Sequence, residues 1–155
     1  MAMALRFDKL QPVTMPPIEQ YPVHIKCLKD DIDIGVWIAT GSEAFGYSID
    51  ENVIVPLLAC GDVELLLAYN ADSEPVATGL LLKTDGIVGI HQIGVPADHQ
   101  GKGYATQMMR FLIQLAEKWQ ADYVVLQASE AGRAVYQRLG FVDQFLITYL
   151  QRNKI

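Results

Sequence analysis

The chain has 155 residues, of which 51% are hydrophobic and 19% charged, so it suits one globular domain and not a disordered segment. Its net charge of −6 and pI near 4.9 argue against a polyanion-binding protein, because nucleic-acid affinity rests largely on Lys and Arg that neutralise phosphates. We therefore expect no nucleic-acid partner.

The two cysteines, Cys27 and Cys60, are isolated, with neither metal-ligand spacing nor a disulfide-rich context. This pattern is typical of a reducing compartment, and we expect a cytoplasmic protein. No apolar run approaches the roughly 20 residues that span a bilayer, so we expect no membrane partner. His24, His91 and His99 lie far apart without carboxylate or cysteine companions at ligand spacing, so we expect no metal.

The N-terminal residues 1–20 contain Pro12, Pro16 and Pro17 in a mixed polar and apolar stretch. Proline removes a backbone donor and interrupts helices, so this stretch is interpreted as an extended N-terminal arm. We expect a single domain over residues 21–155.

Hydrophobic periodicity predicts the elements of that domain. In chain order they are a strand at 23–28, helices at 31–45 and 51–59, strands at 63–69, 75–83 and 87–95, a helix at 103–119, a strand at 123–126, a helix between Ser129 and Gly140, and a strand at 141–150. Three consecutive antiparallel strands, a helical crossover and a further strand indicate an α+β sandwich with a mixed sheet.

A glycine-containing loop, Gln100-Gly101-Lys102-Gly103-Tyr104-Ala105, separates a predicted strand from a strongly amphipathic predicted helix. The first turn of a helix has backbone NH groups without intrahelical partners and a positive partial charge, so such a loop can bind a pyrophosphate. Gly101 and Gly103 allow unusual backbone angles and close approach of a ligand. The loop is a candidate phosphate-binding site.

Two common phosphate-binding motifs do not match this loop. A P-loop requires Ser or Thr after its Gly-Lys pair, but Gly103 follows Lys102. A dinucleotide fingerprint requires a third glycine where Thr106 stands, and no acidic residue ends a second strand near residues 123–128.

The remaining pattern, with Gln100, Gly103 and Ala105 at fixed spacing, resembles the acetyl-CoA loop of the GNAT family of acyl-CoA-dependent N-acetyltransferases. Residues 129–141 resemble that family's last helix, which commonly ends Tyr-x-x-x-Gly-Phe; here Ser129 stands where many members carry Asn. The resemblance implies a three-layer α/β/α sandwich with a mixed, mostly antiparallel sheet, and acetyl-CoA as cosubstrate. It also raises a homodimer as a family-level expectation.

The resemblance implies a set of cofactor contacts on the predicted strand, the loop and the last helix. These candidates are Ile93, Gly94, Val95, Gln100, Gly101, Lys102, Gly103, Tyr104, Ala105, Thr106, Ser129 and Arg133. Within the set, Ile93 is expected to contact the pantetheine, and the backbone NH of Val95 is the expected oxyanion donor. Gly94 and Pro96 fit a locally interrupted strand ladder.

Two residues are the catalytic candidates. Tyr136 stands where the family places a tyrosine that protonates the CoA thiolate; the alternative is a half-buried tyrosine that joins the helix to the sheet. His91 is a candidate general base because it titrates near neutrality and shares strand parity with Ile93, although a lone strand histidine is commonly structural. Glu43 and Tyr47 are weaker candidates for the base.

The predicted loop that contains Phe45 and Tyr47 could line a substrate pocket, together with Glu43, or could simply connect two helices. We expect an N-acetyltransferase that transfers the acetyl group of acetyl-CoA to a primary amine of a small molecule, by direct attack in a ternary complex. Neither cysteine has a visible activating partner for a covalent route. The alternatives are a protein or peptide N-acetyltransferase and a non-catalytic acyl-CoA-binding regulatory module.

Overall fold

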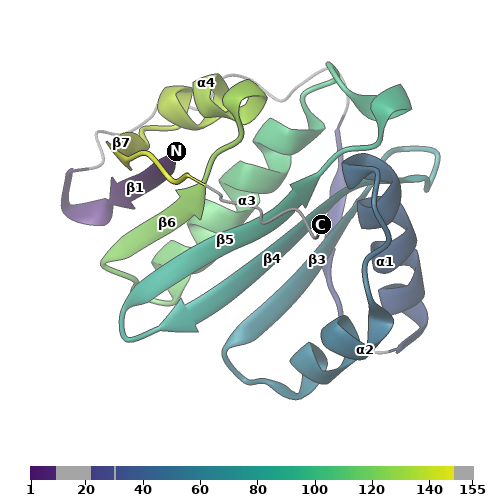
Figure 1. Cartoon of the computed structure of the whole chain (residues 1–155). Coiled ribbons are helices and arrows are strands. Elements are labelled where there is room, and N and C mark those ends of the chain that lie inside the picture. Colours follow the sequence, from purple (N-terminus) through teal and green to yellow (C-terminus); the bar gives the residue numbers. More distant parts are fainter. Residues whose placement is uncertain (10–21, 30, 149–155) are drawn as a thin grey trace, which may run out of the picture.

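The computed structural model describes residues 1–9, 22–29 and 31–148, and its centre is a seven-stranded sheet (Figure 1). The strands run in the order β2-β3-β4-β5-β6-β1-β7. They are β1 (Ala2–Arg6), β2 (His24–Cys27), β3 (Val63–Tyr69), β4 (Pro75–Thr84), β5 (Ile87–Gly94), β6 (Tyr123–Gln127) and β7 (Val142–Phe145). All neighbouring strands are antiparallel except β5 and β6, which are parallel.

Helices cover both faces of this sheet. They are α1 (Asp31–Phe45), α2 (Glu51–Ile54), α3 (Tyr104–Lys118) and α4 (Glu130–Arg138), with short 3-10 turns η1 (Phe7–Lys9), η2 (Val55–Ala59) and η3 (Ala97–His99). In Figure 1, α3 crosses behind the sheet, whereas α1 and α2 lie on the side toward the viewer. The predicted three-layer α+β sandwich with a mixed, mostly antiparallel sheet is confirmed.

The two faces of β4 explain how the layers pack. Leu80 belongs to the core under α1, whereas Leu81 belongs to the core under α3. Gly79 also faces α3, and a Cβ there would lie 3.1 Å from the sulfur of Met108, so the glycine allows α3 to pack closely. On the other face, the indole NH of the fully buried Trp37 donates to the Gly79 carbonyl at 3.2 Å.

Helix α3 forms because its apolar residues recur at three- and four-residue spacing and reach the sheet together. Met108, Met109, Leu112 and Ala116 are all fully buried. Burial of each large side chain of this kind contributes about 1.5–3 kcal/mol, so this one face holds the helix against the sheet. The start of α3 is therefore fixed relative to β5, which precedes it.

The prediction of an N-terminal arm is wrong for Ala2–Arg6, which form β1 between β6 and β7. Met3 and Leu5 are buried, while the residues that alternate with them are more exposed. The short apolar alternation thus pairs with the sheet despite the prolines that follow it. Residues 10–20 of the predicted arm lie outside the described residues.

Two further elements are shorter than predicted. The helix predicted at 51–59 is α-helical only over Glu51–Ile54 and continues as the 3-10 turn η2, which contains Pro56; proline cannot donate the backbone hydrogen bond that an α-helix would need. The last strand covers Val142–Phe145, and residues 149 and 150 of the prediction lie outside the described residues.

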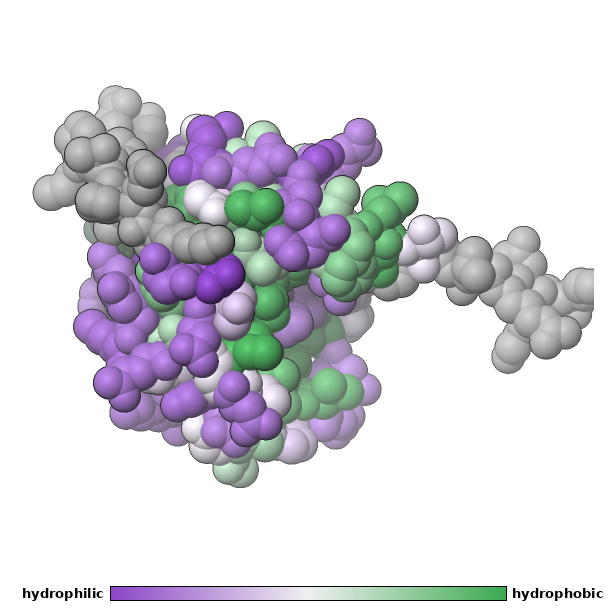
Figure 2. Space-filling model, turned by 90° about the vertical axis from the view of Figure 1, so that its left-hand side faces the viewer, coloured by the Kyte–Doolittle hydropathy of each residue, from purple (hydrophilic) through white to green (hydrophobic). Residues whose placement is uncertain are grey.

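Strand β7 forms one edge of the sheet. Figure 2 views this side of the molecule and shows apolar surface among the polar side chains. The exposed apolar residues of β7 and its continuation are Val142, Phe145 and Leu146. Among the described residues, no helix combines the length and the apolar character required to cross a bilayer.

Candidate active site

A pocket lies where two central strands separate. Strands β5 and β6 pair from Ile87 and Tyr123 to Ile90 and Leu126, and the pairing ends there. A pocket of about 430 Å³ opens beyond the last pair, and we call it the divergence pocket. Its lining residues are Phe45, Tyr47, Ile90, His91, Gln92, Ile93, Leu126, Gln127, Ser129 and Tyr136.

A β-bulge shapes the β5 wall of this pocket. Leu80 of β4 pairs with His91, but Thr78 pairs with Gly94, so β5 contains one extra residue in this interval. Gln92 has the left-handed φ of 53°, and its carbonyl accepts a hydrogen bond from the Thr78 hydroxyl at 2.8 Å. The predicted interruption of the ladder exists, but it is centred on Gln92 and not on the glycine or proline that follow.

The bulge makes the prediction of shared strand parity wrong. His91 lies on the α1 face with its partner Leu80, whereas Ile93 lies on the α3 face, where its Cδ1 would be 3.4 Å from a Cβ on Gly79. The His91 ring extends over Gly89, at which a Cβ would lie 2.7 Å from Nε2. His91 and Ile93 nevertheless both line the divergence pocket.

His91 is partly desolvated by this packing. Burial penalises the charged imidazolium and lowers the pKa of His91 from its ordinary value. The imidazole is therefore neutral at neutral pH, with a lone pair available to accept a proton. Its position in the pocket keeps it a candidate base.

Tyr136 enters the pocket from α4. The Ser129 hydroxyl caps this helix by accepting from the Gly132 NH at 3.1 Å, as predicted, and a Cβ on Gly132 would lie 3.0 Å from the Tyr136 ring. The ring also meets Phe141 edge-on, with centroids 6.1 Å apart. Burial raises the pKa of Tyr136, so its phenol remains protonated at neutral pH and can donate.

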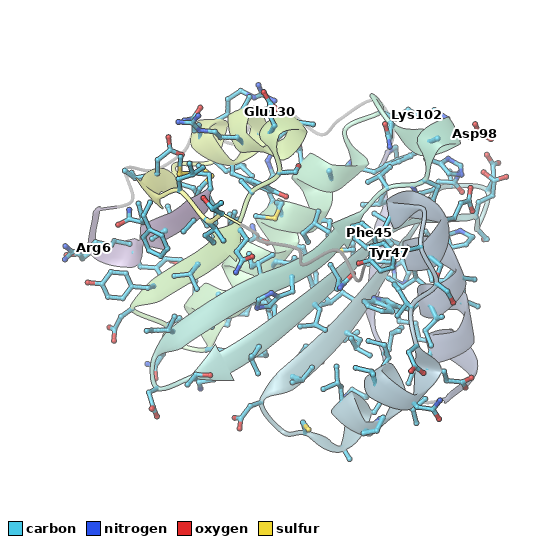
Figure 3. The ribbon with its side chains drawn as sticks, viewed as in Figure 1. Arg6, Phe45, Tyr47, Asp98, Lys102 and Glu130 are labelled. Atoms are coloured by element: carbon cyan, nitrogen blue, oxygen red, sulfur yellow. The ribbon has the colours of Figure 1, made fainter. Side chains whose placement is uncertain are left out.

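An aromatic pair stands at the end of α1 (Figure 3). The rings of Phe45 and Tyr47 stack with centroids 5.6 Å apart and an interplanar angle of 19°. Between them Gly46 has a φ of 71°, which turns the chain so that both rings reach the divergence pocket. Tyr47 is 55% exposed. Glu43, also predicted for the substrate site, is exposed and does not line this pocket.

A second pocket of about 290 Å³, the loop pocket, lies at the start of α3. Its lining residues are Val95, His99, Gln100, Gly101, Gly103, Tyr104, Ala105, Thr106, Val135 and Arg138. Gly101 and Gly103 have φ values of 75° and 83°, and Gly103 is the N-cap of α3. These left-handed turns leave the positive end of the helix open, an arrangement that suits an anionic phosphate.

Side chains of the loop brace it internally. The Gln100 amide donates to the Val95 carbonyl at 3.1 Å, and the Lys102 ammonium donates to the Asp98 carbonyl at 3.0 Å. Lys102 is not a lining residue, whereas Arg138 at the end of α4 is. The basic residue among the predicted loop contacts is Lys102, but among the described lining residues Arg138 supplies the permanent positive charge.

Two further predicted cofactor contacts do not line either pocket. Arg133 forms an ion pair with Asp143 of β7, and this guanidinium lowers the pKa of the Asp143 carboxyl. Gly94 is buried beneath α1, where a Cβ would lie 3.0 Å from both Ala44 and the Phe45 ring. These residues support the surrounding structure.

Sequence reasoning missed several lining residues. Gln92 and Gln127 line the divergence pocket, and Val135 and Arg138 line the loop pocket. Val135 and Arg138 are three residues apart and lie on one face of α4, whereas Tyr136 lines the other pocket, so the tyrosine gives no signal for them. Nothing in the residue pattern marks Gln92 as the site of a bulge. Within the described parts of the chain, no three His, Cys, Asp or Glu side chains gather in a group that could hold a metal ion.

Several solved acetyltransferase structures share this fold. A GCN5-related N-acetyltransferase from Sphaerobacter thermophilus has a TM-score of 0.70 at 23% identity, over 91% of this chain and 47% of its own. The ribosomal-protein-S18-alanine N-acetyltransferase from Escherichia coli has a TM-score of 0.70 at 17% identity, over 80% of each chain. A Bacillus subtilis acetyltransferase in complex with CoA has a TM-score of 0.65 at 24% identity, over 80% of this chain and 79% of its own.

These identities show a shared fold, and the chain spans about half the length of the S. thermophilus protein. Among curated protein sequences, none is significantly similar to this chain. The model of the acetyltransferase (GNAT) family matches residues 37–141, which is more than half of the chain. The match includes the last part of α1 and all of α2, α3, α4 and β3 to β6. The chain therefore belongs to the acetyltransferase (GNAT) family.

Proposed function

We propose that the protein is an N-acetyltransferase that transfers the acetyl group of acetyl-CoA to a primary amine of a small molecule. The observation that carries this proposal is the divergence pocket, where His91 of β5 and Tyr136 of α4 line one cavity. The pKa shifts of both groups favour the uncharged forms that a base and an acid need before reaction. Acetyl-CoA is the acyl donor of the family.

The loop pocket fits the diphosphate of that donor. Gly101 and Gly103 hold left-handed conformations, and a Cβ on Gly101 would meet no atom within 4 Å, so the loop has open space above its backbone. The NH groups of the first turn of α3 and the guanidinium of Arg138 would hold the phosphates. Ile93 and Ser129 line the other pocket, where the acyl end would lie.

Acetyl-CoA supplies an activated thioester when bound, and the residues of the chain supply orientation and proton transfer. The His91 imidazole accepts a proton from the acceptor's ammonium, directly or through water, and leaves a neutral amine that can attack the thioester carbonyl. As the new C–N bond forms and the C–S bond breaks, the Tyr136 hydroxyl donates its proton to the departing sulfur, and the phenolate takes up the proton that the new amide nitrogen loses. The backbone NH of Val95 is our proposed donor to the thioester oxygen.

Direct attack in a ternary complex is favoured over an acetyl-cysteine route. Neither Cys27 nor Cys60 lines the divergence pocket, and burial raises the pKa of the Cys27 thiol, which disfavours the nucleophilic thiolate. A cytoplasmic location, indicated by the isolated cysteines, stays a prediction.

A small acceptor is supported by the size of the pocket, about 430 Å³, which is lined by four parts of the chain, namely the end of α1, β5, β6 and α4. The alternative of a protein or peptide acceptor is supported by the likeness to the E. coli enzyme, which acts on an alanine of ribosomal protein S18. A non-catalytic acyl-CoA-binding module is the third candidate, and it predicts binding without turnover.

The experiment that tests the proposal measures thiol release from acetyl-CoA with the purified full chain, across small amines and short peptides. Mass spectrometry of the acceptor identifies an N-acetyl product, and calorimetry measures acetyl-CoA binding separately. Amine-dependent thiol release with an acetylated small amine supports the proposal. Acetylation of peptides alone favours the second candidate, and binding without thiol release for any acceptor favours the third.

A further inference from the structure

The divergence pocket differs from the rest of this acidic protein in its charge. The chain has a net charge of −6, yet none of the described residues that line this pocket is Asp, Glu, Lys or Arg. His91 is its only lining group that titrates near neutrality, and desolvation lowers the pKa of that group. The other polar side chains that line the pocket are the amides of Gln92 and Gln127 and the hydroxyl groups of Tyr47, Ser129 and Tyr136.

This neutrality restricts what can bind. A charged group that leaves water needs an opposite charge or several hydrogen bonds, and without them its transfer into the pocket is unfavourable. An acceptor with a carboxylate, a phosphate or a second ammonium would find no such counter-charge among the described lining residues. Acceptors with a single charged group avoid this cost.

The aromatic pair at the end of α1 gives one wall of the pocket an apolar surface instead. Phe45 and Tyr47 are stacked, and Tyr47 is 55% exposed although it is a large aromatic side chain. A second aromatic or apolar group laid against such a pair gains contact area and favourable ring geometry. Ile90, Ile93 and Leu126 continue the apolar surface inside.

We propose that the acceptor is a small primary amine whose amino group is its only charged group and whose body is aromatic or apolar. This inference rests on the N-acetyltransferase function proposed above and narrows its substrate class. It separates the protein from enzymes that would take polyamines, amino acids with a free carboxylate, or sugar phosphates.

Because His91 is a weak base, we also expect a preference among these amines for those of low basicity. An alkylammonium with a pKa of about 10.4 is harder to deprotonate than an α-ammonium of about 7.7–8.0, by about 1.4 kcal/mol for each pKa unit. No carboxylate lines the described pocket to assist, so the work falls to His91. Weakly basic amines are therefore better acceptors than alkylamines of equal size.

The first test is a matched acceptor series for the full chain at one pH near 7.5. L-phenylalaninamide and L-phenylalanine share the same ring and α-amino group, but the first carries a neutral carboxamide where the second carries a carboxylate. Phenethylamine has the same ring and amino group with neither a carboxamide nor a carboxylate. Spermidine has several positive charges. We expect kcat/KM to be highest for L-phenylalaninamide, lower for phenethylamine, and at least about tenfold below phenethylamine for both L-phenylalanine and spermidine. Equal or greater turnover of either multiply charged amine would overturn the inference while leaving the transferase function intact. No thiol release with any amine would overturn both.

The second test introduces the missing charge. Gln92→Glu puts a carboxylate on the pocket wall with little change of shape, and Gln114→Glu makes the same substitution on the exposed face of α3, away from both pockets. We expect the ratio of kcat/KM for spermidine to that for L-phenylalaninamide to rise at least about tenfold in the first variant and to stay unchanged in the second. Gln127→Glu repeats the test from β6 in case Gln92→Glu does not fold. An unchanged ratio in every folded pocket variant would refute the inference.

Discussion

The loop pocket and the divergence pocket lie at the two ends of the same connection, from β5 to α3, but they are built differently. Two glycines shape the loop pocket, because Gly101 and Gly103 take left-handed conformations at the start of a helix. The divergence pocket is lined by residues from four separate parts of the chain. A glycine-shaped loop needs particular residue types at fixed spacing, so it is visible in sequence, whereas a pocket assembled from distant segments depends on strand register.

The electrostatics of the two pockets differ in the same way. The loop pocket gathers positive potential from the helix terminus and Arg138. The divergence pocket instead shifts the pKa values of His91 and Tyr136 toward their uncharged forms. We therefore expect substitutions in the loop pocket to change acetyl-CoA binding, and substitutions in the divergence pocket to change the rate of the chemical step.

The largest effect is expected for Tyr136→Phe. Loss of the hydroxyl removes the proposed proton donor but keeps the ring that meets Phe141 edge-on. We expect kcat to fall by about 10²–10⁴-fold, the usual range for loss of a general acid. Calorimetry should give an acetyl-CoA Kd within about twofold of the wild type, because the loop pocket is unchanged.

Tyr123→Phe is the matched control for that variant. Tyr123 is on β6, where its ring lies under the Arg6 guanidinium, and it lines neither pocket. Its kcat should equal that of the wild type. A Tyr136→Phe enzyme with full kcat would assign the tyrosine a purely structural role.

A smaller loss is expected for His91→Gln, about 10²-fold in kcat/KM above neutral pH. This value lies at the lower end of the range for a general base, because the lowered pKa of His91 makes the imidazole a weaker base. Below a pKa that lies under about 6.5, the wild-type imidazole is protonated and cannot accept the amine proton. The ratio of wild-type to variant kcat/KM should therefore fall toward one as pH falls through that value. This ratio cancels the ionisation of the amine itself, and a ratio that is constant with pH would exclude His91 as the base.

The same contrast explains how much could be predicted from sequence. The elements of the core followed from periodicity, and the cap at Ser129 and the end of α4 at Gly140, with its φ of 94°, followed from residue type. Such features are local. The glycine loop was likewise identified, although Arg138 and not Lys102 lines its pocket.

The parts that were not predicted depend on contacts distant in sequence. Met3 and Leu5 are buried in the larger core cluster, which β1 reaches because it pairs between β6 and β7. The bulge at Gln92 depends on the Thr78 hydroxyl of the neighbouring strand. No local pattern at Gln92 indicates either the extra residue or the separation of His91 and Ile93 onto opposite faces.

A moderate effect on binding alone is expected for Gly103→Val. A β-branched residue at a φ of 83° costs about 1–2 kcal/mol, and relief of that strain would distort the N-cap of α3. We expect the acetyl-CoA Kd to rise at least about tenfold, with kcat at saturating acetyl-CoA nearly unchanged. Gly35→Ala in α1, where a Cβ meets no atom within 4 Å, should leave the Kd unchanged. An unaltered Kd for Gly103→Val would show that this glycine does not shape the cofactor site.

The smallest effect concerns stability and the bulge itself. Gln92 holds a left-handed backbone, and its buried Oε1 has no hydrogen-bond partner, so both features cost free energy in the native state. Gln92→Gly removes both costs but gives the unfolded chain more entropy, and we expect a net gain of about 1 kcal/mol, or about 2–4 °C in Tm. Gln114→Gly, in the regular helix α3, should instead lower stability by about 1 kcal/mol. Thermal unfolding of both variants measures the change in Tm relative to the wild type. A higher Tm for Gln92→Gly with a lower Tm for Gln114→Gly would mean that the Gln92 side chain is retained at a cost to stability, as expected for a residue of a functional pocket. A lower Tm for Gln92→Gly would mean that the Gln92 side chain holds the bulge in place.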